Sequence, residues 1–99
     1  RNLAISRAVP ALFLWAEIFW VQTNDKVRLR IIGPSGEIVI DHHKVLKKRQ
    51  ARRMVFLGRE SRGQPWPVGR YQGEVLIERR EGSDRINRYR AQSYIELKN

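Results

Sequence analysis

The sequence of 99 residues contains no cysteine. Disulfide bonds, thiolate metal ligands and a cysteine nucleophile are therefore excluded. A chain without cysteine fits a reducing compartment, and it equally fits a secreted domain that folds without disulfides. This absence leaves the localisation open. The length predicts a single domain, and a hydrophobic content of 41% is sufficient for one core.

Long hydrophobic runs are also missing. The longest apolar stretch extends from Ala11 to Val21 and is interrupted by Glu17. A bilayer-spanning helix needs about 20 apolar residues, so no membrane span is expected. The stretch also lacks the flanks and the cleavage site of a signal peptide. The chain opens at Arg1 and Asn2 without a methionine, and we expect it to be a domain excised from a larger protein.

Catalytic signatures are absent as well. The sequence has no GxSxG, P-loop or HExxH motif and no carboxylate pair at a spacing suited to acid–base chemistry. A metal site could start from Asp41, His42 and His43, but adjacent histidines on a strand point to opposite faces, and no further ligand is evident. We predict a non-enzymatic chain without cofactor or metal, and metal catalysis is the weakest alternative.

Acidic residues are scarce, with 10 Asp and Glu against 20 Lys and Arg, which gives a net charge of +10. Such a charge attracts nucleic acid and other polyanions. It is densest in the segment KVLKKRQARR, whose cations are candidates for phosphate binding. These are Lys44, Lys47, Lys48, Arg49, Arg52 and Arg53. The alternative is a solvated connection, or a strand edge that these charges protect from pairing with other chains.

Alternation of apolar and polar residues dominates the chain, and turn residues recur at short intervals. Strands are predicted over residues 2–9, 11–20, 26–32, 37–41, 52–58, 70–79 and 86–97. Residues 43–50 fit either a short helical turn or a loop. About seven strands without helical periodicity predict an all-β, immunoglobulin-like antiparallel β-sandwich over residues 1–99. A small, partly open β-barrel is the alternative.

The predicted second strand is apolar on both faces. One of its faces is expected to point to the core. This face carries Leu12, Leu14, Ala16, Ile18 and Trp20. Phe13, Trp15 and Phe19 then emerge on the opposite face. Monomers seldom leave such a patch bare, so these three are candidates for an interface unless another strand covers them.

Charged residues alternate along three later strands. If residues 26–32, 70–79 and 86–97 are neighbours, Arg28 and Arg30 would lie beside Glu74 and Glu78, and Arg88 and Arg90 would follow. We expect a stabilising ladder of opposite charges on this outer face. The alternative is an arginine-rich platform with Tyr94 as a stacking residue.

The segment from Pro65 to Tyr71 carries the pattern WPxGxY at the entry to a predicted strand. It resembles the penultimate-strand entry of bacterial immunoglobulin-like domains. That resemblance implies a bend at Gly69 and a tyrosine, Tyr71, packed over the end of the sandwich. From the residues alone, Trp66 and Tyr71 are expected in the core or at a corner.

With the Gly33–Gly36 turn, residues 10–80 resemble accessory β-domains of bacterial envelope proteins, including domains appended to zinc peptidoglycan peptidases of the M23 type. None of the zinc-binding histidines and aspartates of those peptidases has a counterpart here, so the resemblance implies no peptidase activity. It implies an appended domain with a positioning or recruiting role.

These observations predict a non-catalytic accessory or interaction domain of a larger bacterial extracytoplasmic protein. Its partners would be the rest of that protein or another protein, with anionic envelope polymers as a further partner. The expected localisation is the periplasm or cell envelope, and the cytoplasm stays open. The alternative function is nucleic-acid binding through Lys44–Arg53. That function is less favoured, because the sequence lacks an RNP signature, a GXXG loop and a recognition helix.

Overall fold

The computed structural model describes residues 3–99, which form seven β-strands. The strands are β1 (Leu3–Ser6), β2 (Ala11–Val21), β3 (Asp25–Ile32), β4 (Ile38–Leu46), β5 (Gln50–Glu60), β6 (Gly69–Glu81) and β7 (Arg85–Lys98). This confirms the all-β prediction. Asn2, where the first predicted strand starts, lies outside the described residues. Within residues 3–99 no helix is long and apolar enough to cross a membrane.

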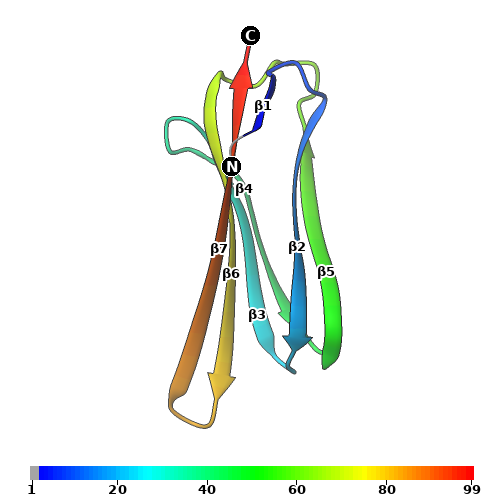
Figure 1. Cartoon of the computed structure of the whole chain (residues 1–99), viewed down its shortest axis with the longest axis vertical. Coiled ribbons are helices and arrows are strands. Elements are labelled where there is room, and N and C mark those ends of the chain that lie inside the picture. The colour runs from blue at the N-terminus through cyan, green and yellow to red at the C-terminus, as the bar shows by residue number, and fades with distance from the viewer. Residues whose placement is uncertain (1–2) are drawn as a thin grey trace.

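The strands form two open sheets that face each other (Figure 1). One sheet has five strands in the order β1-β7-β6-β3-β4, and the other consists of β2 and β5. All pairs are antiparallel except β1 with β7. The second and fifth strands oppose the third, sixth and seventh, which is the immunoglobulin-like order. The fold is therefore the predicted sandwich, and the barrel alternative is wrong.

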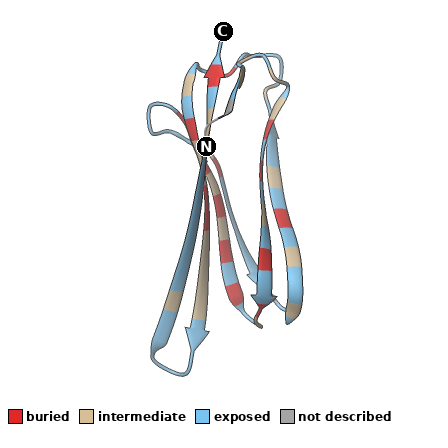
Figure 2. Ribbon diagram, in the orientation of Figure 1, coloured by how far each residue is buried: buried red, intermediate tan, exposed pale blue. Residues whose placement is uncertain are grey.

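The core lies between the two sheets and follows from the alternation of the strands. Val27, Leu29 and Ile31 of β3 point inward, while Leu12 and Leu14 of β2 point toward them. Buried and exposed bands accordingly alternate along both sheets (Figure 2). The remaining buried apolar side chains are Ile18, Val21, Ile40, Leu46, Val55, Trp66, Tyr71, Val75 and Leu97.

The WPxGxY segment forms a corner at one end of the sandwich. The Tyr71 hydroxyl donates a hydrogen bond to the carbonyl oxygen of Pro67 at 2.7 Å. A tyrosine at the start of the penultimate strand that bonds a few residues upstream is characteristic of immunoglobulin-like sandwiches. The Trp66 indole is buried and donates to the carbonyl oxygen of Val9 at 3.1 Å. Both aromatic residues are therefore structural, as the sequence predicted.

Trp20 departs from the alternation and corrects one prediction. We expected Trp20 to face the core, but its side chain is 70% exposed. Its backbone has a φ of 57°, in the left-handed region, which rotates the side chain away from the core before Val21 turns in again. The Trp20 carbonyl oxygen accepts a hydrogen bond from Arg79 Nη2 at 3.0 Å. The same guanidinium donates to both carboxylate oxygens of Asp25.

The predicted helical turn or loop over residues 43–50 is wrong for its first half. β4 continues to Leu46, and only residues 47–49 connect it to β5. The buried Leu46 explains the difference, because it lies opposite Asp25 at the end of β3 and closes the core there. β5 likewise begins at Gln50, before the predicted start. β4 and β5 belong to different sheets, so the short basic turn between them carries the chain from one layer of the sandwich to the other.

Candidate functional site

The outer face of the β2–β5 sheet carries a large apolar patch. Phe13, Trp15 and Phe19 of β2 and Met54 and Phe56 of β5 are each 59–70% exposed. The register places Trp15 directly opposite Phe56, and Phe13 opposite Gly58. These five side chains therefore lie on one face, which we call the aromatic face. The structure thus places all three residues predicted as interface candidates on the solvent side.

The aromatic face is built by local sequence choices. β2 and β5 are apolar on both sides, so that Leu14 and Val55 enter the core while their neighbours point to solvent. Gly58 leaves room for the Phe13 ring, because a Cβ atom there would lie 2.4 Å from that ring. The ring therefore lies directly over the backbone of β5. An aromatic ring packed over a glycine of the neighbouring strand helps to fix the register of a sheet.

One charged pair lies on the aromatic face. Glu17 is opposite Met54, and its carboxylate is 3.8 Å from the guanidinium of Arg52. Trp20 is exposed next to Phe19, where β2 ends. The patch is therefore apolar along β2 and β5 and becomes mixed with charge toward the Trp20 end.

The exposed area of the aromatic face comes mainly from its aromatic rings. An aromatic side chain contributes about 150–250 Å². Four side chains of the aromatic face, Phe13, Trp15, Phe19 and Phe56, are 60–70% exposed, which leaves roughly 400–650 Å² open to solvent before Met54 is added. The largest apolar patch of a typical monomer covers about 300–600 Å², and one side of a standard protein interface covers about 800 Å². The patch therefore matches the largest apolar patches of monomers and approaches one side of a standard interface.

A groove lies beside the aromatic face, between β2 and the five-stranded sheet. It has a volume of about 420 Å³. Its walls and floor come from five strands, including Leu12 and Leu14 of β2, Ile5 of β1, Ile31 of β3, Gly73 of β6, and Ser93 and Ile95 of β7. No ionisable side chain other than two tyrosines lines it among the described residues.

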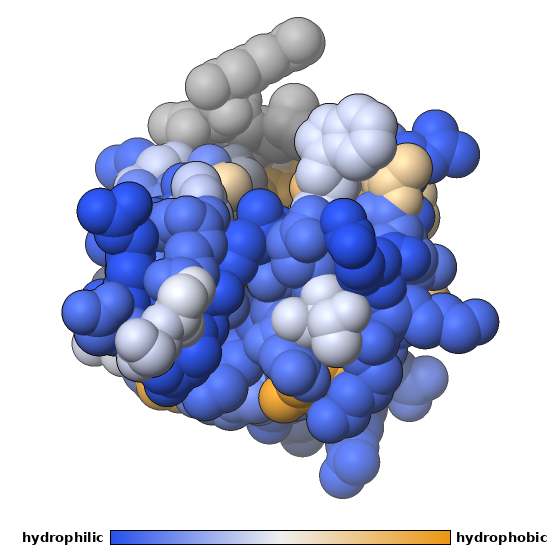
Figure 3. All heavy atoms as spheres, turned by 90° about the horizontal axis from the view of Figure 1, so that it is seen from below, coloured by the Kyte–Doolittle hydropathy of each residue, from blue (hydrophilic) through white to orange (hydrophobic). Residues whose placement is uncertain are grey.

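The basic segment does not form one continuous patch. Lys44 lies on β4, Lys47, Lys48 and Arg49 form the turn, Arg52 borders the aromatic face, and Arg53 lies opposite the buried Ile18. The end of the molecule that holds the β2–β3, β4–β5 and β6–β7 turns is mainly hydrophilic, with a few paler side chains (Figure 3). The six polyanion candidates are therefore divided among several surfaces.

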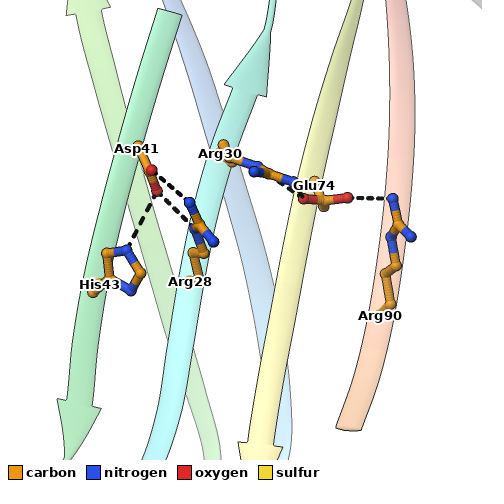
Figure 4. A network of polar contacts seen from close by, with 6 residues as sticks. All are labelled: Arg28, Arg30, Asp41, His43, Glu74 and Arg90. Carbon is orange, nitrogen blue, oxygen red and sulfur yellow. Dashed lines mark hydrogen bonds and ion pairs between the residues drawn. The ribbon is translucent and has the colours of Figure 1, made fainter. Parts of the chain in front are cut away.

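The outer face of the five-stranded sheet carries the predicted charge ladder (Figure 4). Glu74 is buried and pairs with Arg30 on one side and Arg90 on the other. Burial raises the pKa of Glu74, but hydrogen bonds and charges from these arginines outweigh it and hold the pKa below the usual range. Arg88 pairs with Glu78 at 3.2 Å. The ladder is confirmed.

The alternative, a platform on which Tyr94 stacks with a ligand, is disfavoured because the Tyr94 ring is covered. The guanidinium of Arg70 lies 3.9 Å from the centroid of the Tyr94 ring and covers it. Several arginines of the face are held by carboxylates, as described above. This surface therefore stabilises the sheet through its own pairs, and much of its positive charge is already neutralised locally.

His42 and His43 point to opposite faces, as two adjacent strand residues should. His43 lies opposite Arg28 on the outer face, and His42 lies opposite the buried Leu29. Asp41 pairs with Arg28 at 2.7 Å and lies 3.6 Å from His43 Nε2. The hydrogen bond from Arg28 lowers the pKa of Asp41. Residues 3–99 hold no group of three or more His, Asp or Glu side chains arranged to bind a metal.

Met54 and Phe56 were not singled out from the sequence, and Trp20 was assigned to the core. A signal for the first two exists, because Met54-Val55-Phe56-Leu57 is an unbroken apolar run in a strand. Such a run must place apolar side chains on both faces. No comparable signal exists for Trp20, because its exposure depends on a left-handed backbone that the long-range contact with Arg79 holds.

The comparisons with known proteins identify no relative. No family model, no curated protein and no solved structure matches the chain.

Proposed function

We propose that the chain is a non-catalytic docking domain that binds another protein surface through the aromatic face. The observation that carries this proposal is the set of five large apolar side chains, 59–70% exposed, on one two-stranded sheet. Sustained exposure of that area to water is unfavourable by about 25 cal/mol per Å². Covering it with a partner surface therefore provides a substantial driving force for association.

The setting of this function is proposed from the resemblance described above. An accessory domain of a bacterial envelope protein would dock on the rest of that protein or on a neighbour, in the periplasm or cell envelope. The positive charge adds attraction to anionic envelope polymers. The flat sandwich, with its ion-paired side opposite the aromatic face, suits a domain that is recognised from one side.

Site-specific photo-crosslinking in the source cell tests the proposal. A benzoyl-phenylalanine at Phe56 should yield crosslinks to protein, and Trp15→Ser in the same chain should reduce them at least fivefold. The matched control places the crosslinker at Gln92, which is exposed on the opposite side of the other sheet. Crosslinks of equal yield from both positions, or crosslinks only to lipid or nucleic acid, would overturn the proposal.

Nucleic-acid binding is the second candidate, and one observation favours it. Lys47, Lys48 and Arg49 form an exposed turn, and none of them makes an ion pair within residues 3–99. Binding to a labelled DNA duplex at physiological salt, with a steep salt dependence, would establish this candidate. The division of the basic segment among several surfaces favours the docking function instead.

A further inference from the structure

The two layers of the sandwich differ in width. A five-stranded sheet faces a sheet of only two strands, so part of its inner face has no cover. In immunoglobulin-like sandwiches the second and fifth strands lie in a four-stranded sheet, each flanked by a further strand. Here the place beside β2 holds the groove. The inner face of β7 is correspondingly bare, with Ala91 and Ser93 exposed and Tyr89 48% exposed.

Small residues form the floor of this groove. Gly73 and Ser93 line it and lie opposite each other on β6 and β7, and the exposed Ala91 follows on the same face of β7, next to the groove. A Cβ atom at Gly73 would lie 2.8 Å from Leu14 and from Ser93 Oγ, so no larger residue fits at this position of the floor. The space above Ala91 and Ser93 is open instead. It suits apolar side chains that enter from outside.

The free edge of β2 borders the same groove. β2 pairs only with β5 within the described residues, so every second residue directs its N–H and C=O groups to the other edge. Proteins protect such edges with charges, proline or bulges. From Ala11 to Ala16 the edge has none of these.

The other long edges of the molecule differ in this respect. The free edge of β5 carries Arg52, Arg53 and Arg59, and the part of β7 beyond β1 carries Arg85, Arg88 and Arg90. The free edge of β4 carries Asp41 and Lys44. Positive charges along an edge discourage pairing with another chain. The edge of β2 is therefore the one that is built to accept a strand.

We propose that an extended polypeptide segment adds to the free edge of β2 and fills the groove, with alternating apolar side chains directed at Ala91 and Ser93. Main-chain hydrogen bonds would supply affinity, and the groove would select the inward residues. The net charge of +10 favours a segment that carries carboxylates outside the groove. This inference rests on the proposed docking function, because the added strand would extend the aromatic face.

A second copy of the chain does not fit this place. In a second copy the β2 strand has its own five-stranded sheet beneath it. That sheet would have to occupy the space in which β7 and β1 of the first copy already line the groove. A single strand without an underlying layer meets no such obstacle. The occupant is therefore a lone extended segment.

Peptide binding to the whole chain tests this inference. The probe is a fluorescein-labelled peptide of alternating valine and threonine with two glutamates at each end, followed by anisotropy. The control peptide has the same composition in an order that breaks the alternation. We expect the alternating peptide to bind at least tenfold more tightly, and to slow hydrogen exchange at alternate amides of β2.

Two variants locate the site. Ser93→Lys fills the groove and should weaken peptide binding at least tenfold. Gln92→Lys adds the same charge on the opposite face of β7 and should leave binding unchanged or slightly tighter. Ala91→Lys replaces the first variant if Ser93→Lys fails to fold. Equal affinities for the two peptides, or equal effects of the groove and control variants, would overturn the inference.

The outcome is separable from that of the proposed function. If crosslinking at Phe56 succeeds while peptide binding fails, the aromatic face docks protein by another mode and only strand addition is wrong. If crosslinking at Phe56 fails, the proposed docking function is wrong, whether or not the peptide binds.

Discussion

The buried ion pair between Asp25 and Arg79 offers the sharpest test of the folding argument. Asp25 is 1% exposed and receives hydrogen bonds from Arg79 Nε at 3.0 Å, Arg79 Nη2 at 2.8 Å and the Gln22 amide at 2.9 Å. Arg79 also holds the Trp20 carbonyl. One side chain therefore joins the ends of β2, β3 and β6.

Arg79→Met keeps an unbranched, flexible apolar side chain and removes the guanidinium group with its charge. The variant leaves the Asp25 carboxylate buried without its main partner, and breaking such a pair costs about 3–5 kcal/mol of unfolding free energy. At about 4 °C per kcal/mol for a domain of this size, we expect Tm to fall by at least about 12 °C. Arg80→Met is the control, because Arg80 is exposed and should cost less than about 0.5 kcal/mol.

The pH dependence gives a second readout with a definite sign. Burial raises the pKa of Asp25, but the bonds from Arg79 and Gln22 outweigh it and lower the pKa below its ordinary value. The ionised group therefore stabilises the wild type above about pH 4, and this stability is lost as the pH falls through the depressed pKa. In Arg79→Met burial dominates and raises the pKa, so the penalty of the variant should shrink as the pH falls from neutral toward 4.

Urea unfolding followed by tryptophan fluorescence, at neutral pH and near pH 4, measures both effects. The difference between wild type and variant should be largest at neutral pH. A penalty below about 1 kcal/mol, or one that is the same at both pH values, would refute the argument, since a buried unpaired carboxylate must respond to protonation.

Three further predictions concern the corner, the aromatic face and the net charge. Tyr71→Phe should lower the unfolding free energy by about 1 kcal/mol through loss of its bond to Pro67, measured by urea unfolding; no loss would mean that the corner contributes nothing. Gly58→Ala should cost about 1–3 kcal/mol by crowding the Phe13 ring, and a cost that persists in a Phe13→Ser background would contradict this cause. Rising salt should promote self-association, seen as a larger sedimentation coefficient, because salt screens the repulsion between chains of charge +10. Phe56→Ser should abolish this effect. Dissociation of the chains with rising salt would instead point to electrostatic contacts.

The fold could be predicted from the sequence because the alternation of side chains and the positions of the turn residues indicate the same strands. The alternation in residues 26–32 and the Gly33–Gly36 turn are independent signs of antiparallel strands, and both correspond to what forms. The exceptions have a physical origin outside the local sequence. β4 continues to Leu46 because a core position exists there, which no local pattern specifies.

The candidate site was accessible only in part. Phe13, Trp15 and Phe19 follow from simple alternation within β2, since Leu12 and Leu14 identify the inward side. The groove does not follow from any pattern, because it depends on the number of strands in each sheet. Neither the pairing of β1 with β7 nor the absence of a strand beside β2 within residues 3–99 could be read from propensities.

The charge and the aromatic face can be understood together. On the outer face of the five-stranded sheet, arginines are matched with carboxylates, and Glu74 alone holds two of them. Four arginines there pair with only three carboxylates, so this face keeps part of the surplus, and another part lies at Lys47, Lys48 and Arg49 in the β4–β5 turn. A net charge far from zero keeps chains apart in solution, which offsets the tendency of an exposed apolar face to self-associate. For the proposed docking domain, this repulsion would keep free chains apart while the face stays open for a partner, which gives the basic charge a role that needs no polyanion.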